Sequence, residues 1–324
     1  MSLILKSLFW RPNWALFVAF MCIVSTSHAE SLDSLKQVIA GMEPGMALAE
    51  VHLELADEYS NRALYHEHLE ECEKALKLSK KFGSDLERAR VMLRVGRAHS
   101  NLDEHDKAIS FMEKGMRIYT SNRDEQGVAK ASTELGMVLS RTGEDYREAK
   151  EYLVDALPYH HEHGDVEMLV DSYYTLGGIA YSFEQNPSKT LKHYYRVIEL
   201  RRGQSTMGEV KDNMLAGAYN NSGLIYLYGE EYPLAIEYME KALDCLPEDG
   251  NQKFRAVMNI NLAYLYRKTE EFDVAHHHLN VVQEIASELD IVNFVQLAHD
   301  WRCEMSIEHG RLDSTLHYLA VARE

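Results

Sequence analysis

The chain has 324 residues, with 51 acidic and 34 basic side chains, and its formal net charge is −17. A chain this acidic repels phosphate backbones and anionic lipid headgroups. Its charge therefore argues against nucleic acid and against a membrane surface as the main partner.

The N-terminal segment has the pattern of a secretory signal peptide. Lys6 and Arg11 precede the apolar run 14–24, and a short polar stretch follows. Ser27 and Ala29 supply the small residues that cleavage requires, so we expect cleavage after Ala29 and a periplasmic or secreted chain. The apolar run is about 11 residues, which is short for a membrane span, and an uncleaved N-terminal anchor is the alternative.

Residues 30–46 are predicted to form a capping helix and a linker, with Gly41, Pro44 and Gly45 ending the helical pattern. Three cysteines follow the signal peptide, each inside a helical pattern and far from the others: Cys72, Cys245 and Cys303. An odd number at such spacing does not fit a disulfide framework, so we predict that they are buried apolar residues.

Beyond residue 46 the chain repeats itself about every 40 residues. A small residue flanked by large apolar ones recurs with steps of 40, 40, 41, 46, 40 and 40 residues, as Ala56, Gly96, Gly136, Gly177, Gly223, Ala263 and Cys303. A fixed period of this kind is typical of stacked supersecondary units, which bury their apolar faces against one another.

Each repeat is predicted to be a pair of antiparallel helices, A and B. Apolar residues recur at helical spacing in ARVMLRVGRAH and again in DKAISFMEKGMRIY, with polar turn residues between. Small residues let the two helices approach closely and let the next pair pack against them. We predict an all-α solenoid of about seven helix pairs, with repeats near 47–84, 85–123, 124–164, 165–205, 206–249, 250–289 and 290–324.

The fragment SGLIYLYGEEYPLAIEYMEKALDCLP, residues 222–247, resembles a tetratricopeptide repeat. It has a Gly with an aromatic residue three positions on, alanines in its second helix and a closing Pro247. That family's unit is about 34 residues. The longer step is similar to the repeats of kinesin light chains and of many bacterial regulatory proteins. The resemblance covers 47–324 and implies a right-handed superhelix that binds proteins. The first repeat departs from it, with His68 where alanine is usual.

In such a solenoid, function lies on the concave face, which the A helices line. Counting from the small residue of each A helix, we expect side chains six, three and two residues before it, and one, four and five after it, to face inward. In the fourth to sixth repeats this rule selects tyrosines and asparagines, which suit an extended peptide. The alternative is that these are ordinary solvated residues. The predicted groove residues are Tyr174, Tyr181, Asn220, Asn221, Leu224, Tyr228, Asn261, Tyr264 and Arg267.

The second and third repeats have a basic lining instead. It resembles the carboxylate clamp by which some family members hold a peptide C-terminus, and arginine binds a carboxylate bidentately. Glu54 stands where the clamp would have asparagine, and Glu134 follows, so salt bridges between repeats are the alternative. The predicted basic face consists of Arg90, Arg94, Arg97, Lys130 and Arg141.

The chain carries none of the common catalytic or nucleotide-binding motifs. Two histidine clusters, 160–163 and 276–278, are predicted to be surface residues and not metal ligands. Three consecutive helical residues point about 100° apart and cannot close on one ion. We therefore predict no enzyme, no metal and no cofactor.

Two irregularities mark the repeat array. The step from Gly177 to Gly223 is long, and the excess falls near Gly203 and Gly208, which form either a hinge or a longer loop. The last repeat reaches Glu324 without a polar capping helix, so we expect a homodimer partner, another protein or further sequence to cover it.

Two functions fit the sequence. One is an exported scaffold that binds a peptide or protein segment in its groove. The other is a sensory input module of a bacterial signalling protein whose output domain is absent from this chain. Both predict a protein or peptide partner.

Overall fold

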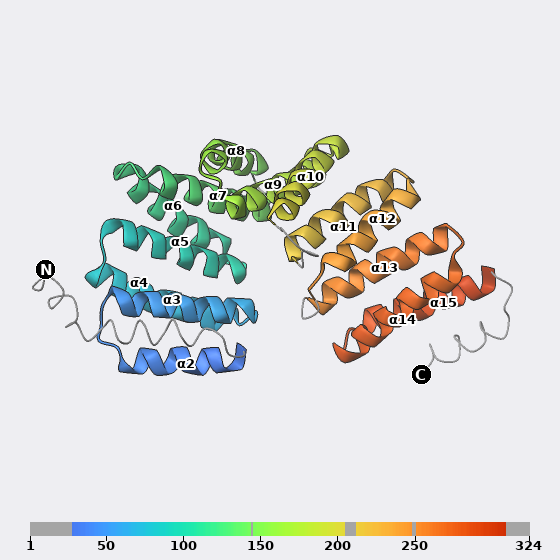
Figure 1. Cartoon of the computed structure of the whole chain (residues 1–324), viewed down its shortest axis with the longest axis horizontal. Helices are drawn as coiled ribbons and strands as arrows, with labels where there is room; N and C mark the ends of the chain where they lie inside the picture. Colours follow the sequence, from blue (N-terminus) through green and yellow to red (C-terminus); the bar gives the residue numbers. More distant parts are fainter. Residues whose placement is uncertain (1–27, 144, 205–211, 248–250, 309–324) are drawn as a thin grey trace, which may run out of the picture. The chain divides into compact units, whose positions relative to one another are not determined.

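The computed structural model describes residues 28–143, 145–204, 212–247 and 251–308. All regular secondary structure in these residues is helical, which confirms the predicted all-α solenoid of helix pairs (Figure 1). The helices are α2 (His28–Gly41), α3 (Met46–Asn61), α4 (Tyr65–Phe82), α5 (Asp85–Asn101), α6 (His105–Ser121), α7 (Glu125–Thr142), α8 (Tyr146–His163), α9 (Val166–Ser182), α10 (Pro187–Gly203), α11 (Asn213–Tyr228), α12 (Tyr232–Cys245), α13 (Gln252–Lys268), α14 (Phe272–Glu288) and α15 (Val292–Glu308).

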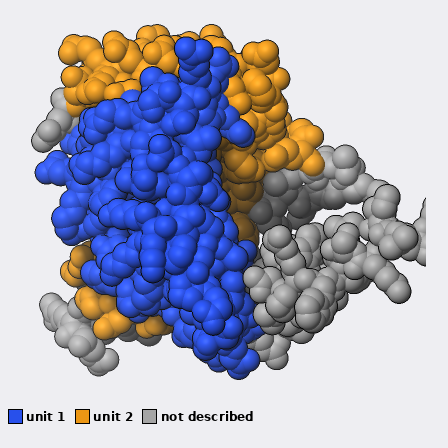
Figure 2. Space-filling view, turned by 90° about the vertical axis from the view of Figure 1, so that its left-hand side faces the viewer, with its two compact units in different colours: residues 1–142 blue, residues 143–324 orange. Residues whose placement is uncertain are grey.

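The chain divides into two compact units, residues 1–142 (unit 1) and 143–324 (unit 2), which are coloured separately in Figure 2. Within each unit every helix packs on the next one along the chain, as in α3 on α4 and α11 on α12. The A helices also contact each other, α5 with α7 in unit 1 and α9 with α11 in unit 2. Each unit is therefore a stack of helical hairpins with its A helices side by side.

The boundary between the units falls at Thr142, between the two helices of the third predicted repeat. The predicted hinge or loop lies elsewhere, since α10 extends to Gly203 and residues 205–211 are outside the described part of the chain. Leu316 and Leu319 of the predicted uncapped end are also outside it, as is most of the predicted signal peptide. None of the described helices combines the length and the apolar character needed to cross a membrane.

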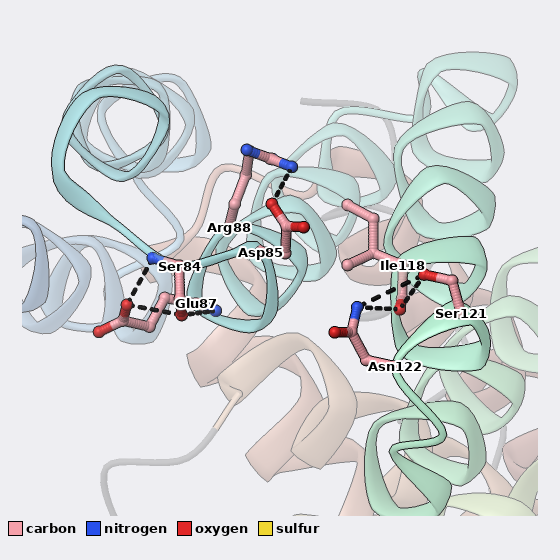
Figure 3. A network of polar contacts seen from close by, with 7 residues as sticks. All are labelled: Ser84, Asp85, Glu87, Arg88, Ile118, Ser121 and Asn122. Atoms are coloured by element: carbon pink, nitrogen blue, oxygen red, sulfur yellow. Dashed lines mark hydrogen bonds and ion pairs between the residues drawn. The ribbon is translucent and has the colours of Figure 1, made fainter.

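Helix ends follow local capping chemistry. Before α5, the hydroxyl of Ser84 accepts from the backbone N–H of Glu87 at 3.3 Å, and the Glu87 carboxylate accepts from the backbone N–H of Ser84 at 2.7 Å (Figure 3). This reciprocal arrangement satisfies two donors that the first helical turn leaves unpaired. After α6, the Asn122 amide donates to the carbonyl of Ile118 at 2.8 Å. Side chains of Asp145, Asp165, Asn186, Asp212 and Asn251 cap the starts of α8, α9, α10, α11 and α13.

Most turns between helices contain one residue in the left-handed conformation. These residues are mostly not glycines and include Ala63 with φ 57° after α3 and Glu270 with φ 65° after α13. A side chain in this conformation costs about 1–2 kcal/mol. The turns therefore store strain that the packed hairpins on either side must offset.

The repeated small residues sit where paired helices come closest. A Cβ on Gly96 would lie 2.7 Å from Cγ of Met112, and one on Gly223 would lie 2.8 Å from Cγ of Met239. Neither gap has room for even one methyl group. In α9, a Cβ on Gly177 would meet the Tyr194 ring at 2.7 Å. The 40-residue period thus marks the contacts that bring each A helix against its B helix.

The cysteines are free thiols in the described residues, with Cys72 and Cys303 buried and Cys245 half-buried. Burial raises the pKa of Cys72 to about 12, so this thiol stays protonated and packs as a small apolar group.

Candidate peptide-binding face

The nine predicted groove residues lie on three A helices of unit 2: α9, α11 and α13. We call the surface that these helices form the unit 2 face. Because α9 packs beside α11, residues more than 40 positions apart in sequence meet there. The structure brings most of the predicted residues together, but it gives them different roles.

A chain of hydrogen bonds crosses the unit 2 face from α9 to α13. The side-chain amide of Asn221 donates to the hydroxyl of Tyr174 at 3.3 Å and to that of Tyr194 at 3.2 Å. Asn220 donates to the Asn221 carbonyl oxygen at 3.2 Å. Asn261 donates to the Asn220 carbonyl oxygen at 3.5 Å. The amides that were expected to bind a peptide backbone therefore join the A helices to each other.

Asn221 occupies the centre of this chain. Both hydrogens of its amide nitrogen are directed to tyrosine hydroxyls, and its oxygen accepts from Asn220. Burial raises the pKa of Tyr194, and burial likewise raises that of Tyr174, so both hydroxyls remain neutral. The prediction missed Tyr194 because it lies on a B helix, which the counting rule for A helices does not include.

The counting rule does not hold in most repeats for the position three residues before the small residue. Leu53, Leu93, Thr133 and Asn220 are buried there, Tyr174 and Ile260 are half-buried, and Asp300 is exposed. Three helical residues turn the side chain by about 300°, which is only about 60° from the small residue. The position therefore lies at the border of the packed interior, and on α11 it makes Asn220 a structural residue.

Two tyrosines are exposed at the end of the unit 2 face. The rings of Tyr181 on α9 and Tyr228 on α11 are stacked, with centroids 6.5 Å apart and planes 26° apart. Their exposed fractions are 41% and 69%. These exposed rings are accessible from solvent, whereas the amides of Asn220 and Asn221 are hydrogen-bonded within the protein.

The rest of the unit 2 face is less accessible. Leu224 is half-buried and packs against the core of unit 2. Tyr264 packs against Trp301, with ring centroids 6.0 Å apart, and Arg267 pairs with Glu304 at 2.5 Å. Trp301 lies two residues before Cys303, so the counting rule extended to the seventh repeat would have included it.

Gly178 leaves an open position on α9 between Tyr174 and Tyr181. It is one residue after the small Gly177, where other A helices carry Arg97, Leu224 or Tyr264. A Cβ built on Gly178 would meet no described atom within 4 Å. Glycine inside a helix costs about 1 kcal/mol relative to alanine. Packing within the described residues does not require this glycine, and the space beside it is open.

The predicted basic face lies on α5 and α7 of unit 1, and its three arginines on α5 pair with acidic side chains. Arg90 pairs with Glu50 and Arg94 with Asp57, both on α3, while Arg97 pairs with Glu134 on α7 at 2.6 Å. These contacts are the salt bridges between repeats that the sequence left as the alternative to a carboxylate clamp.

The two cations of α7 differ from the arginines of α5. Arg141 donates to the hydroxyl of Ser100 at 3.1 Å. Lys130 is half-buried and makes no hydrogen bond or ion pair with any described residue.

Two buried histidines stand out near these faces. His68, at the position where alanine was expected, is 1% exposed on α4. Burial, and then the neighbouring Arg94, lower its pKa to about 4, so it is neutral at physiological pH. His160 is also buried, which corrects the expectation of a surface residue, and it faces Asp165 at 3.5 Å.

The other histidines of the first cluster are exposed. His161 contacts the Tyr173 hydroxyl at 2.8 Å, and His163 the carbonyl of Tyr159 at 2.9 Å. In the second cluster, His278 contacts the Asn259 side-chain oxygen at 2.8 Å. Within the described residues, no group of three histidine, cysteine or acidic side chains is placed to hold a metal ion.

Comparison with known proteins agrees with this arrangement. The family model for the tetratricopeptide repeat matches residues 89–122 in unit 1 and 216–244 in unit 2. These segments cover most of the hairpins α5/α6 and α11/α12. No curated protein matches the chain in sequence.

Solved structures with the same fold cover most of the chain. The apo quorum sensor NprR from B. thuringiensis aligns with a TM-score of 0.64 and 16% identity over 95% of this chain and 85% of that one. A Rap protein complexed with Competence and Sporulation Factor aligns with a TM-score of 0.59 and 13% identity over 90% and 78%. A signal-transduction ATPase with a tetratricopeptide repeat sensor from Pyrococcus horikoshii has a TM-score of 0.67 and 16% identity over 86% and 43%. The chain therefore carries two segments that match the tetratricopeptide-repeat model, and it shares the helical-solenoid fold of these proteins.

Proposed function

We propose that the chain is a non-catalytic interaction protein that binds an extended segment of a partner on the unit 2 face. The observation that carries this proposal is the exposed pair Tyr181 and Tyr228, which stack across two adjacent A helices. Tyrosine provides a large contact area with little conformational entropy to lose, so it is common at binding surfaces.

The surroundings of this pair favour an extended main chain as the ligand. Gly178 lies three residues before Tyr181 on the same helix face, and the space above it is open. A ligand backbone can approach α9 there while its side chains reach the tyrosines on either side. Asn261 keeps capacity for such a ligand, because its amide makes a single long contact of 3.5 Å.

Unit 1 offers a less favourable surface. A partner that bound the arginines of α5 would have to displace Glu50, Asp57 and Glu134. Glu134 is 3% exposed, and a buried carboxylate that loses its partner is strongly destabilised. The ion pairs of unit 1 therefore support a structural role for the arginines.

The sensory alternative is supported by two structures with a similar fold, a quorum sensor and a protein with a tetratricopeptide repeat sensor. The proposed location outside the cytoplasm rests on the sequence pattern of residues 1–29. A scaffold and a sensor share the first step, which is recognition of a peptide or protein.

Selection from a library of random ten-residue peptides tests this step. We expect the purified chain to enrich peptides that the double variant Tyr181→Ala, Tyr228→Ala no longer holds. Tyr65→Ala is the matched control, because Tyr65 is a tyrosine with 38% exposure on α4 of unit 1. Enrichment that survives the double variant, or no enrichment at all, would contradict binding at the unit 2 face.

A further inference from the structure

We propose that the partner segment presents a lysine or arginine side chain to the Tyr181–Tyr228 pair. This inference rests on the proposed function and specifies the chemistry of its ligand. The pair is a site for a cation because its aromatic rings, the helix ends beside it and the charge of the whole unit all favour a positive group.

The two rings lie at the C-terminal ends of their helices. Tyr228 is the last residue of α11, and Tyr181 is the last but one of α9. Unpaired carbonyls give the C-terminal end of a helix a partial negative charge of about half an elementary charge. Two adjacent A helices place two such ends beside the same pair of rings, and a cation is stabilised there.

No cation of the described residues lies over these two rings. Elsewhere, Lys268 lies over Tyr264 at 5.4 Å, Lys241 over Tyr238 at 5.4 Å and Arg147 over Tyr146 at 5.3 Å from the ring centroids. Across the described residues, neither ring of the exposed pair has such a partner. The negative faces of these rings remain available to a cation from outside.

Fixed charges around the pair act in the same direction. The basic residues near the end of α9, Lys150 and Lys189, are both paired with Glu184. Glu230 follows Tyr228 by two residues, is exposed, and makes no side-chain hydrogen bond or ion pair with any described residue. A cation that approaches the pair therefore meets the unpaired carboxylate of Glu230, whereas the ammonium groups of Lys150 and Lys189 are already paired.

The negative charge of the chain is distributed unevenly between the two units. Acidic residues outnumber basic ones by 15 in residues 143–324 and by only 2 in residues 1–142, which together make the net charge of −17. Unit 2 thus attracts basic segments over the distance of the Debye length, about 8 Å at physiological salt, and it repels acidic ones. Charge complementarity therefore favours a basic peptide segment as the partner.

Peptides enriched by the purified chain test the inference. We expect them to share one lysine or arginine, and replacing it by norleucine in a synthetic peptide should weaken binding by about three- to thirtyfold, the range that cation–π contacts provide. Tyr228→Phe, which keeps the ring, should bind the parent peptide within about twofold. Tyr228→Leu, which is apolar but has no ring, should lose as much affinity as the norleucine peptide does.

The outcomes separate this inference from the proposed function. Enriched peptides that depend on Tyr181 and Tyr228 but lack a shared basic residue would overturn the cation site and leave peptide binding intact. Equal affinity of Tyr228→Phe and Tyr228→Leu would also overturn it. Failure to enrich any peptide would instead overturn the proposed function itself. Because Tyr228 is 69% exposed, neither variant should alter the fold, which circular dichroism verifies.

Discussion

Replacing Asn221 by alanine should destabilise unit 2, because this residue holds three A- and B-helix side chains together. Asn221 donates to Tyr174 and Tyr194 and accepts from Asn220. Tyr194 and Asn220 are 3% and 4% exposed, so water cannot easily replace the lost partner. A buried polar group without a partner costs about 1–3 kcal/mol, and we expect Asn221→Ala to lose about 3 kcal/mol in total.

Urea unfolding followed by tryptophan fluorescence measures this loss, because Trp301 lies in α15 of unit 2. With a typical slope of about 2 kcal/mol per molar urea, the midpoint should fall by about 1.5 M. Asn213→Ala is the matched control, an exposed asparagine in the first turn of the same helix, and it should change stability by less than about 0.5 kcal/mol.

A double-mutant cycle isolates one contact. Tyr194→Phe removes only the hydroxyl that Asn221 binds and should cost about 1 kcal/mol. Combined with Asn221→Ala, it should add little, which gives a coupling energy of about 1 kcal/mol. A loss below about 0.5 kcal/mol for Asn221→Ala would refute this reasoning. It would return Asn221 to the role expected from its position in the repeat, that of a residue free to bind a ligand.

Three further substitutions have directions set by the structure. Gly178→Ala should stabilise unit 2 by about 1 kcal/mol, or about 2–4 °C in a thermal melt, and a loss of stability would show that the position is not open. Gly96→Ala should instead destabilise unit 1, because its Cβ would lie 2.7 Å from Met112. Ala63→Gly, at φ 57°, should gain about 0.5–1 kcal/mol in urea unfolding, and no gain would argue against strain in the turns. The pKa of His68 is lowered to about 4 in the folded chain, so the unfolded chain binds a proton first as the pH falls below 6.5. Between pH 7.5 and 5 the parent should therefore lose about 1–2 kcal/mol more stability than His68→Gln, and parallel profiles for the two would contradict this.

The repeat architecture was predictable because its cause is local and periodic. A small residue at Gly96 or Gly223 is needed wherever two helices touch, so the need recurs at each repeat and is visible in one sequence. The left-handed turn residues were not predictable from residue type, since alanine, arginine and glutamate occupy positions where glycine would be less strained.

The candidate face was predicted less well, because the sequence pattern gives the direction of each side chain but not the residue that it contacts. Helical geometry predicted that Tyr181 and Tyr228 are exposed, and they are. It predicted the same for Asn220, which is buried. Whether an arginine is free or paired depends on a residue about 40 positions away, as for Arg90 and Glu50. Such pairings follow from the stacking of repeats, and the periodicity alone does not specify them.

Hydrogen–deuterium exchange of the chain with and without an enriched peptide locates the binding site. Ligand binding slows exchange in the segments that it stabilises. We expect slower exchange in α9 and α11, at the ends that carry Tyr181 and Tyr228, and unchanged exchange in α5 and α7. Protection confined to the helices of unit 1, or none in either unit, would contradict a binding site on the unit 2 face.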